Sequence, residues 1–267
     1  MILASHGIIA SQIASFDADA VAFFTRVTTA GGTLSNTEKQ AVNKLVLDLK
    51  ANSLWTPMKA IYPMVGASAA ACAQNLKSSS FTGTFSSGWT FASTGVTPNG
   101  TSAYMDTFFN INTEQTAANN YTQGYYSGTV GQANANKCSM GASSIVSDSD
   151  VFIKWGDGKL YLYINENTYN NSYTNADSHG FYVGNRPSTN TIQYWKNGVK
   201  VLDIANTPAS KTNASIYLGA RNNNGSPLFY DNKRCQFAFM GNGLSDTQQS
   251  NLYTAVQAFQ TTLSRQV

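Results

Sequence analysis

HGFYVGNRPSTNTIQYWKNGVKVLDI, residues 179–204, is the stretch that decides the fold. It reads as three short strands joined by turns, with aromatic and β-branched residues alternating along the strands. At Asn197 and Gly198 the chain carries two residues that tolerate positive φ, which is what a type I′ hairpin turn requires. We therefore predict that Val199–Ile204 returns antiparallel to Thr191–Lys196.

A second hairpin is predicted around Gly156-Asp157-Gly158, between Val151–Trp155 and Lys159–Asn165. Along its second strand aliphatic residues alternate with tyrosines, so the two kinds of side chain point to opposite faces. The aliphatic positions are Leu160, Leu162 and Ile164, and the tyrosines are Tyr161 and Tyr163. Both faces are thus partly apolar, as expected where one face of a curved sandwich sheet is covered or binds something.

Three helices are predicted outside these strands. Asp17 caps a short helix that ends at Gly31-Gly32. The capping box Ser35–Glu38 begins a second helix that carries one apolar stripe. A similar cap at Ser245–Gln248 begins the last helix, which also carries an apolar stripe.

The domain organisation follows from these elements. Residues 1–57 form a leader and two amphipathic helices for anchoring or assembly, and residues 58–267 form a β-sandwich closed by a helix over 245–264. The apolar stripes of the first two helices need a covering surface. They pack either on the sandwich itself or on another subunit.

Composition bounds the class of protein. A chain of 267 residues buries a sizeable core without needing disulfides or a metal. Only 12% of its residues are charged, the formal net charge is +3, and lysines and arginines occur singly, which gives no support to nucleic-acid binding. The cysteines Cys72, Cys138 and Cys235 lack the spacing of a metal site and are interpreted as buried thiols.

The apolar opening of the chain, residues 1–16, contains no lysine or arginine and so lacks the basic segment of a secretory signal peptide. It also carries too many polar residues to cross a bilayer. No other apolar run reaches the length of about 18 residues that a membrane-spanning helix needs. We therefore expect a soluble chain with neither a signal peptide nor a membrane span.

Four passages together resemble the concanavalin A-like, laminin-G-like jelly-roll domains of surface proteins and bacteriophage virion proteins. They are the central strands, Gly88–Thr107, Ala214–Asn224, and the last strand with its helix, Gln236–Leu263. The resemblance covers about residues 75–267 and rests on strand pattern rather than on a catalytic signature. It implies a mainly β fold: a concanavalin-like antiparallel β-sandwich (jelly roll) with a short N-terminal helical extension and a C-terminal helix.

The resemblance also implies a function, that of a non-enzymatic bacteriophage virion surface protein, assembled in the host cytoplasm, for host attachment or particle decoration. Its partners would be other virion proteins, sister copies in a homo-oligomer such as a trimer, and a bacterial surface glycan. A purely structural capsid or tail subunit without glycan binding is the alternative. A polysaccharide-degrading enzyme is the third interpretation.

The enzyme interpretation needs two carboxylates flanking a glycosidic bond, about 5–5.5 Å apart for retention or about 6.5–9.5 Å for inversion. The glutamates are Glu38, Glu114 and Glu166, and no Glu-x-Asp-x-x-Glu triplet occurs. Asp148 and Asp150 share one face of the chain but are interpreted as a solvated pair that leads into a strand. Neither histidine lies near a nucleophile motif. We therefore expect no enzymatic activity.

Calcium is the one cofactor considered, because many laminin-G-like and lectin sandwiches hold it with loop carboxylates. The candidate ligands are Asp148, Asp150 and Asp157. A calcium ion takes about 6–8 oxygen ligands, and separate loops would have to supply them.

A candidate glycan site lies in two loops that flank the first central strand. Glycan recognition uses aromatic platforms beside hydrogen-bonding side chains, and both kinds of residue are frequent here. The candidates are Tyr169, Asn170, Asn171, Tyr173, Asp177, Arg186 and Asn190. The alternative is that the tyrosines cap the edge of the sandwich and the asparagines fill turns.

Overall fold

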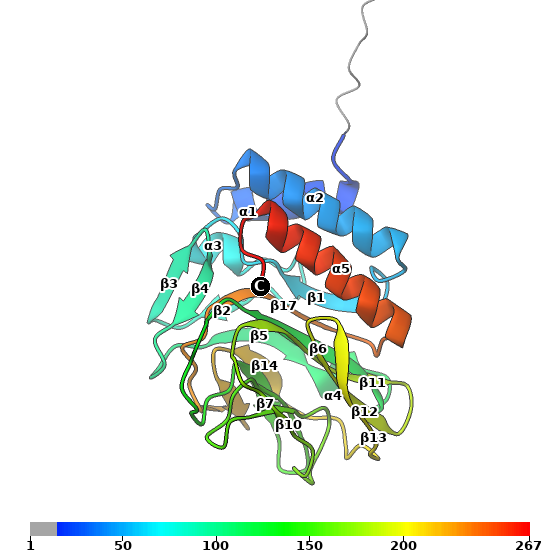
Figure 1. The fold of residues 1–267 in the computed structure, drawn as a ribbon. Helices are drawn as coiled ribbons and strands as arrows, with labels where there is room; N and C mark the ends of the chain where they lie inside the picture. Colours follow the sequence, from blue (N-terminus) through cyan, green and yellow to red (C-terminus); the bar gives the residue numbers. More distant parts are fainter. Residues whose placement is uncertain (1–14) are drawn as a thin grey trace, which may run out of the picture.

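The computed structural model describes residues 15–267, so the predicted leader up to residue 14 lies outside the described residues. Two β-sheets face each other as a sandwich, and a layer of helices covers the outer face of one of them (Figure 1). The predicted fold class is confirmed: the protein is mainly β, with a pair of N-terminal helices and a C-terminal helix.

Sheet A, the sheet under the helices, has eight strands. In spatial order they are β13 (Val199–Ala205), β12 (Thr191–Lys196), β11 (Gly180–Pro187), β6 (Asn120–Ser127), β17 (Cys235–Gly241), β4 (Gly95–Pro98) and β3 (Trp89–Ala92), while β1 (Met58–Tyr62) also pairs with β17. All of these pairings are antiparallel. The three consecutive strands β11, β12 and β13, which contain the predicted Asn-Gly hairpin, form one edge of this sheet.

Sheet B has nine strands. Its main path is β10 (Tyr173–Thr174), β9 (Lys159–Leu162), β8 (Asp148–Phe152), β7 (Met140–Ser143), β14 (Ser215–Leu218), β5 (Met105–Asn110) and β2 (Thr84–Phe85), and a small hairpin of β15 (Arg221–Asn223) and β16 (Ser226–Leu228) joins it. Strand β15 lies parallel to β7, whereas the other pairings in this sheet are antiparallel.

The predicted hairpin between β12 and β13 is confirmed. Asn197 and Gly198 have φ angles of 49° and 74°, as a type I′ turn requires, and Lys196 pairs with Val199 across it. The ladder runs to Ala205, with a bulge opposite Trp195. The Asn-Gly pair therefore sets the register of the sheet edge by local chemistry alone.

Within residues 15–267, five helices accompany the sheets: α1 (Ala18–Thr29), α2 (Asn36–Ala51), α3 (Ala69–Cys72), α4 (Ile111–Glu114) and α5 (Asp246–Thr262). Helices α2 and α5 begin with the predicted capping boxes at Ser35 and Ser245, and Asp17 caps α1. None of the helices in the described part of the chain combines the length and apolarity that crossing a bilayer requires.

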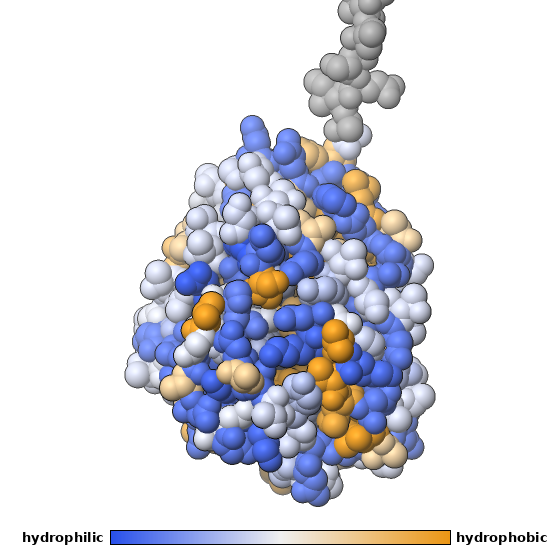
Figure 2. Space-filling view, in the orientation of Figure 1, coloured by the Kyte–Doolittle hydropathy of each residue, from blue (hydrophilic) through white to orange (hydrophobic). Residues whose placement is uncertain are grey.

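The apolar interior has two main parts. One cluster fills the space between the sheets, and the other fills the space between sheet A and the helices. Strand β11 contributes to both, because Tyr182 enters the first cluster while Phe181 and Val183 enter the second. The stripes of α1 and α2 are buried in the second cluster, and hydrophilic or intermediate colours predominate on the outer surface of the helices (Figure 2).

Candidate functional site

A pocket with a volume of about 390 Å³ opens on the outer face of sheet B. Its lining combines six aromatic side chains with one carboxylate and one guanidinium. The lining residues are Asp148, Phe152, Trp155, Tyr161, Tyr163, Tyr169, Arg221 and Phe229. We call this feature the aromatic pocket. The side chains of Leu160, Leu162 and Ile164 point the other way into the core between the sheets, so the predicted alternation along β9 is confirmed.

The aromatic rings of the pocket support one another edge to face. Ring centroids lie 4.6 Å apart for Phe152 and Trp155, 5.1 Å for Trp155 and Phe229, and 5.2 Å for Tyr163 and Tyr169. Burial and the hydrogen bond that Tyr161 donates to a nearby carboxylate raise the pKa of Tyr161 to about 12. The tyrosines thus present neutral phenol groups on a packed wall of rings.

The charged part of the pocket is assembled across three strands. In strand β7, Gly141 pairs with Arg221 of β15 on one side and with Asp150 of β8 on the other. Because Gly141 has no side chain, the Asp150 carboxylate occupies the space beside it. A Cβ at Gly141 would collide with both the Asp150 carboxylate and the Cys138 thiol. Nη2 of Arg221 contacts Asp148, and its Nε lies 3.3 Å from Oδ2 of Asp150.

This ion pair is largely shielded from water. Asp148 and Asp150 are 2% and 0% exposed, and the Arg221 side chain is 14% exposed. Burial raises the pKa of the Asp150 carboxyl well above its usual value, against the opposing charge of Arg221. Burial also disfavours the charged form of Arg221, but the two aspartates outweigh it and raise the pKa of Arg221 above its ordinary value, so the guanidinium stays protonated.

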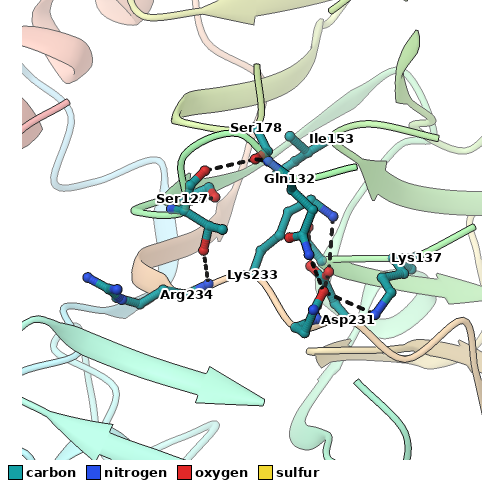
Figure 3. A network of polar contacts seen from close by, with 12 residues as sticks. Ser127, Gln132, Lys137, Ile153, Ser178, Asp231, Lys233 and Arg234 are labelled. Atoms are coloured by element: carbon teal, nitrogen blue, oxygen red, sulfur yellow. Dashed lines mark hydrogen bonds and ion pairs between the residues drawn. The ribbon is translucent and has the colours of Figure 1, made fainter. Parts of the chain in front are cut away.

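A polar network around Asp231 and Lys233 (Figure 3) follows directly after Phe229 in the chain. The Phe229 carbonyl accepts a hydrogen bond from the Cys138 N–H at 2.8 Å. Two residues further on, Asp231 pairs with Lys233 at 3.0 Å and accepts a hydrogen bond from the Ser139 hydroxyl at 2.6 Å. The loop before β7 is tied to the same segment by Gln132, whose amide donates to the Asn232 side chain. The network thus fixes the aromatic side of the pocket.

The interpretation of Asp148 and Asp150 as a solvated pair is wrong. Strand β8 begins at Asp148, three residues earlier than predicted, so both carboxylates lie inside the sheet and face Arg221. Asp157 lies apart in an exposed turn, where it accepts a hydrogen bond from the Tyr161 hydroxyl at 2.6 Å and lies 3.9 Å from the Lys159 ammonium. Residues 15–267 contain no group of three histidines, cysteines or acidic residues arranged to hold a metal ion.

The seven predicted glycan-binding residues do not form one rim. Tyr169 lines the aromatic pocket, and Asn170 beside it is exposed. Tyr173 is exposed on the edge strand β10, outside the pocket lining. Asn171 is buried, with its amide donating to the Glu166 carboxylate at 2.5 Å.

The other three predicted residues serve the framework. Arg186 is wholly buried and donates to the backbone carbonyls of Ile164, Thr191 and Asn206, so its predicted position on an exposed rim is wrong. The side chain of Asp177 accepts from the backbone N–H groups of two loop residues. Asn190 is an exposed turn residue whose carbonyl accepts from the Asn206 N–H.

A buried glutamate anchors the loop that carries Tyr169. Glu166 is 1% exposed, and its carboxylate accepts hydrogen bonds from the side chains of Asn171 and Asn206. Burial raises the pKa of Glu166, while the nearby Arg186 opposes that shift. The backbone of Glu166 also pairs with Asp148, which connects this loop directly to the charged part of the pocket.

Of the eight lining residues, only Asp148 and Tyr169 were predicted from the sequence as site residues, Asp148 for a metal and Tyr169 for a glycan. Phe152, Trp155 and Phe229 were not proposed as site residues, and neither was Arg221. The only available signal was the double-faced pattern of β9, which required a covering or a ligand for Tyr161. Nothing local connects Arg221 with the aspartates, because their contact depends on which strands become neighbours.

Comparison of the sequence with protein-family models and with curated proteins gives no match. Among solved structures, the chain is similar to domain 4 of AbnA, a GH43 extracellular arabinanase from Geobacillus stearothermophilus, in complex with arabinotriose. The identity is 15%, the alignment covers 73% of this chain and 97% of that one, and the TM-score is 0.50. A mutant of Trypanosoma rangeli sialidase displaying trans-sialidase activity gives 9% identity, 82% and 39% coverage, and a TM-score of 0.50.

At these identities the similarity establishes the fold, and this chain spans 39% of the length of the sialidase. The similarity also corrects the prediction of a non-enzymatic bacteriophage virion protein. The same sandwich occurs in an arabinanase and in a sialidase, so the strand pattern that suggested a virion is a property of the fold. The strand pattern therefore gives no support to a role in a virion.

Proposed function

We propose that this chain is a carbohydrate-binding β-sandwich and that the aromatic pocket holds the glycan. The single observation that carries the proposal is the convergence of six aromatic rings with a buried Arg221–Asp148 pair in one cavity. Sugar rings present C–H faces that pack on aromatic rings, and their hydroxyls need fixed donors and acceptors. The cavity volume of about 390 Å³ falls within the range of about 300–1,000 Å³ typical of small-molecule sites.

The similarity to an arabinanase domain in complex with arabinotriose supports a carbohydrate-related role, because that domain has the same fold over nearly its whole length. This agrees better with the polysaccharide-related interpretation of the sequence than with a virion role. The similarity is one of fold, however, and the assignment to glycans depends on the chemistry of the aromatic pocket.

Binding is favoured over hydrolysis by the placement of the carboxylates. Glycosidases of the common two-carboxylate type position two carboxyl groups on either side of the bond. The lining of the aromatic pocket contains Asp148 alone, since Asp150 lies beneath the Arg221 guanidinium with no exposed surface. We therefore assign Asp148 and Arg221 to the hydrogen bonding of sugar hydroxyls and the aromatic side chains to stacking.

The test is titration of the full chain with a panel of oligosaccharides, arabinotriose among them, monitored by calorimetry. Tyr169→Ala removes a half-exposed ring of the pocket and should weaken binding about tenfold. Tyr173→Ala is the matched control, because Tyr173 is a similarly exposed tyrosine of the same loop region outside the pocket lining.

Equal losses in the two variants, or no binding of any saccharide by the unaltered chain, would overturn the proposal. The same panel should be incubated with the chain and analysed for shortened products. Cleavage that disappears in Asp148→Asn would show that the pocket is catalytic instead.

A further inference from the structure

We infer that the aromatic pocket selects uncharged sugars over carboxylated ones; this inference rests on the proposed function. It follows from the contacts of the Arg221 guanidinium with protein carboxylates. Arg221 is the only cationic residue among the eight that line the pocket in the described structure. Recognition of a ligand carboxylate by arginine uses two parallel N–H groups of the guanidinium. In this chain the edge of the guanidinium formed by Nε and Nη2 already faces two carboxylates of the protein.

The guanidinium is occupied along one edge by the protein itself. Nη2 contacts Asp148 and Nε lies 3.3 Å from Asp150, so two carboxylates share the edge that would receive a ligand carboxylate. The register of β7 makes this arrangement rigid, because Gly141 lies between Arg221 and Asp150 and leaves no room for a side chain. An acidic sugar would have to displace a buried aspartate to use this edge.

The rest of the lining offers a carboxylated ligand no compensation. Asp148 itself lines the pocket and would face a ligand carboxylate with like charge in a partly dehydrated site. The ammonium of Lys159, two residues before the lining residue Tyr161, lies 3.9 Å from the Asp157 carboxylate. Neutral hydroxyls meet no such penalty, since Asp148 accepts their hydrogen bonds and the aromatic rings pack on their C–H faces.

The experiment compares pairs of ligands that differ by one carboxylate. Neutral trisaccharides, arabinotriose among them, are each paired with the same trisaccharide after oxidation of the terminal primary hydroxyl to a carboxylate. The unaltered chain should bind the oxidised member at least about tenfold more weakly. Added salt should narrow this gap by screening the repulsion, and should leave the neutral member unchanged.

A substitution then assigns the effect to the pocket. Asp148→Asn keeps the shape, removes one like charge and releases Nη2 of Arg221, so it should shift the ratio of the two Kd values about tenfold toward the acidic ligand. Asp203→Asn is the matched control, because Asp203 is ion-paired with Lys200 on the far sheet and its loss should leave the ratio unchanged.

The outcomes separate the two proposals. If the unaltered chain binds the oxidised sugars as tightly as the neutral ones, or more tightly, the selectivity is overturned and glycan binding stands. The same conclusion follows if added salt weakens the binding of the oxidised sugars. Failure of both members of every pair to bind overturns the proposed function and the selectivity with it. These measurements on the unaltered chain decide the question even if Asp148→Asn does not fold.

Discussion

Two buried ion pairs lie near Phe229, and they differ in the polar atoms that they leave unsatisfied. Asp231 and Lys233 follow it in the chain, whereas the Arg221 guanidinium lies 6.0 Å from the centre of its ring. Lys233 and Asp231 have no exposed surface, stand two positions apart in the chain and form a closed unit. The Asp231 carboxylate accepts from the Lys233 ammonium and from the Asn232 N–H on one oxygen, and from the Ser139 hydroxyl on the other. This pair therefore offers a ligand no unsatisfied hydrogen-bonding atom.

The pair at the pocket is open by comparison. Arg221 approaches Asp150 to 3.3 Å, yet the two atoms are not aligned as a hydrogen bond, and Asp148 reaches the cavity. Its members come from strands that are distant in the sequence. The comparison teaches that a buried ion pair is structural when all its atoms are satisfied locally, and becomes a candidate site when some of them face a cavity.

The largest effect is expected at the closed pair. Lys233→Met leaves the Asp231 carboxylate buried without its counter-charge and should lower the free energy of unfolding by about 3–5 kcal/mol, measured by urea denaturation. Lys233→Met combined with Asp231→Asn should recover much of this loss. The folded fraction of either variant should bind glycan with the affinity of the unaltered chain. If either variant loses more affinity than Arg221→Met does, the two pairs do not differ in function as proposed.

A smaller stability effect with a large binding effect is expected at the open pair. Arg221→Met leaves two carboxylates together without a counter-charge, but burial has already raised the pKa of Asp150, which can take up a proton, so the free energy of unfolding should fall by about 2 kcal/mol. Glycan binding should be lost in the calorimetric titration, because the guanidinium both donates to the ligand and positions Asp148. Retained binding would remove Arg221 from the site.

The smallest effect is a pH dependence of stability that is expected at the open pair. Burial raises the folded-state pKa of Asp150 above its ordinary value of 3.8, so the native state holds a proton that the unfolded chain has released. This favours the folded state below that ordinary value, and the benefit is lost as the pH rises toward the raised pKa. Asp150→Asn removes the titration.

The stability of the unaltered chain relative to Asp150→Asn should therefore fall as the pH rises from acidic to neutral, as measured by urea unfolding at several pH values. The opposite slope would mean that Arg221 dominates and depresses the pKa of Asp150.

The fold itself was predictable where the signals are local. Asn197-Gly198 requires positive φ at both positions, and this requirement fixed a hairpin before any tertiary contact was known. The capping boxes at Ser35 and Ser245 predicted the starts of two helices for the same reason. The alternation of Leu162 with Tyr163 correctly separated the core face of β9 from its outer face.

The candidate site was predictable only in part. Tyr169 belongs to the aromatic pocket as well as to the predicted glycan site, but Arg186 was placed on a rim although it is buried among backbone carbonyls. Charge alone suggested exposure, because an arginine in a polar loop normally keeps its guanidinium in water. Its burial depends on three carbonyls that the folded chain brings to one point.

By itself, then, the sequence determined the strands, the turns, the helix caps and the two-faced character of β9, because each depends on residues a few positions apart. The tertiary structure decided that β15 lies beside β7 and β7 beside β8, which brings Arg221 across Gly141 to Asp150. Strand neighbours are chosen by the packing of the whole sandwich, so no short stretch of the chain encodes them. The aromatic pocket is a consequence of that choice.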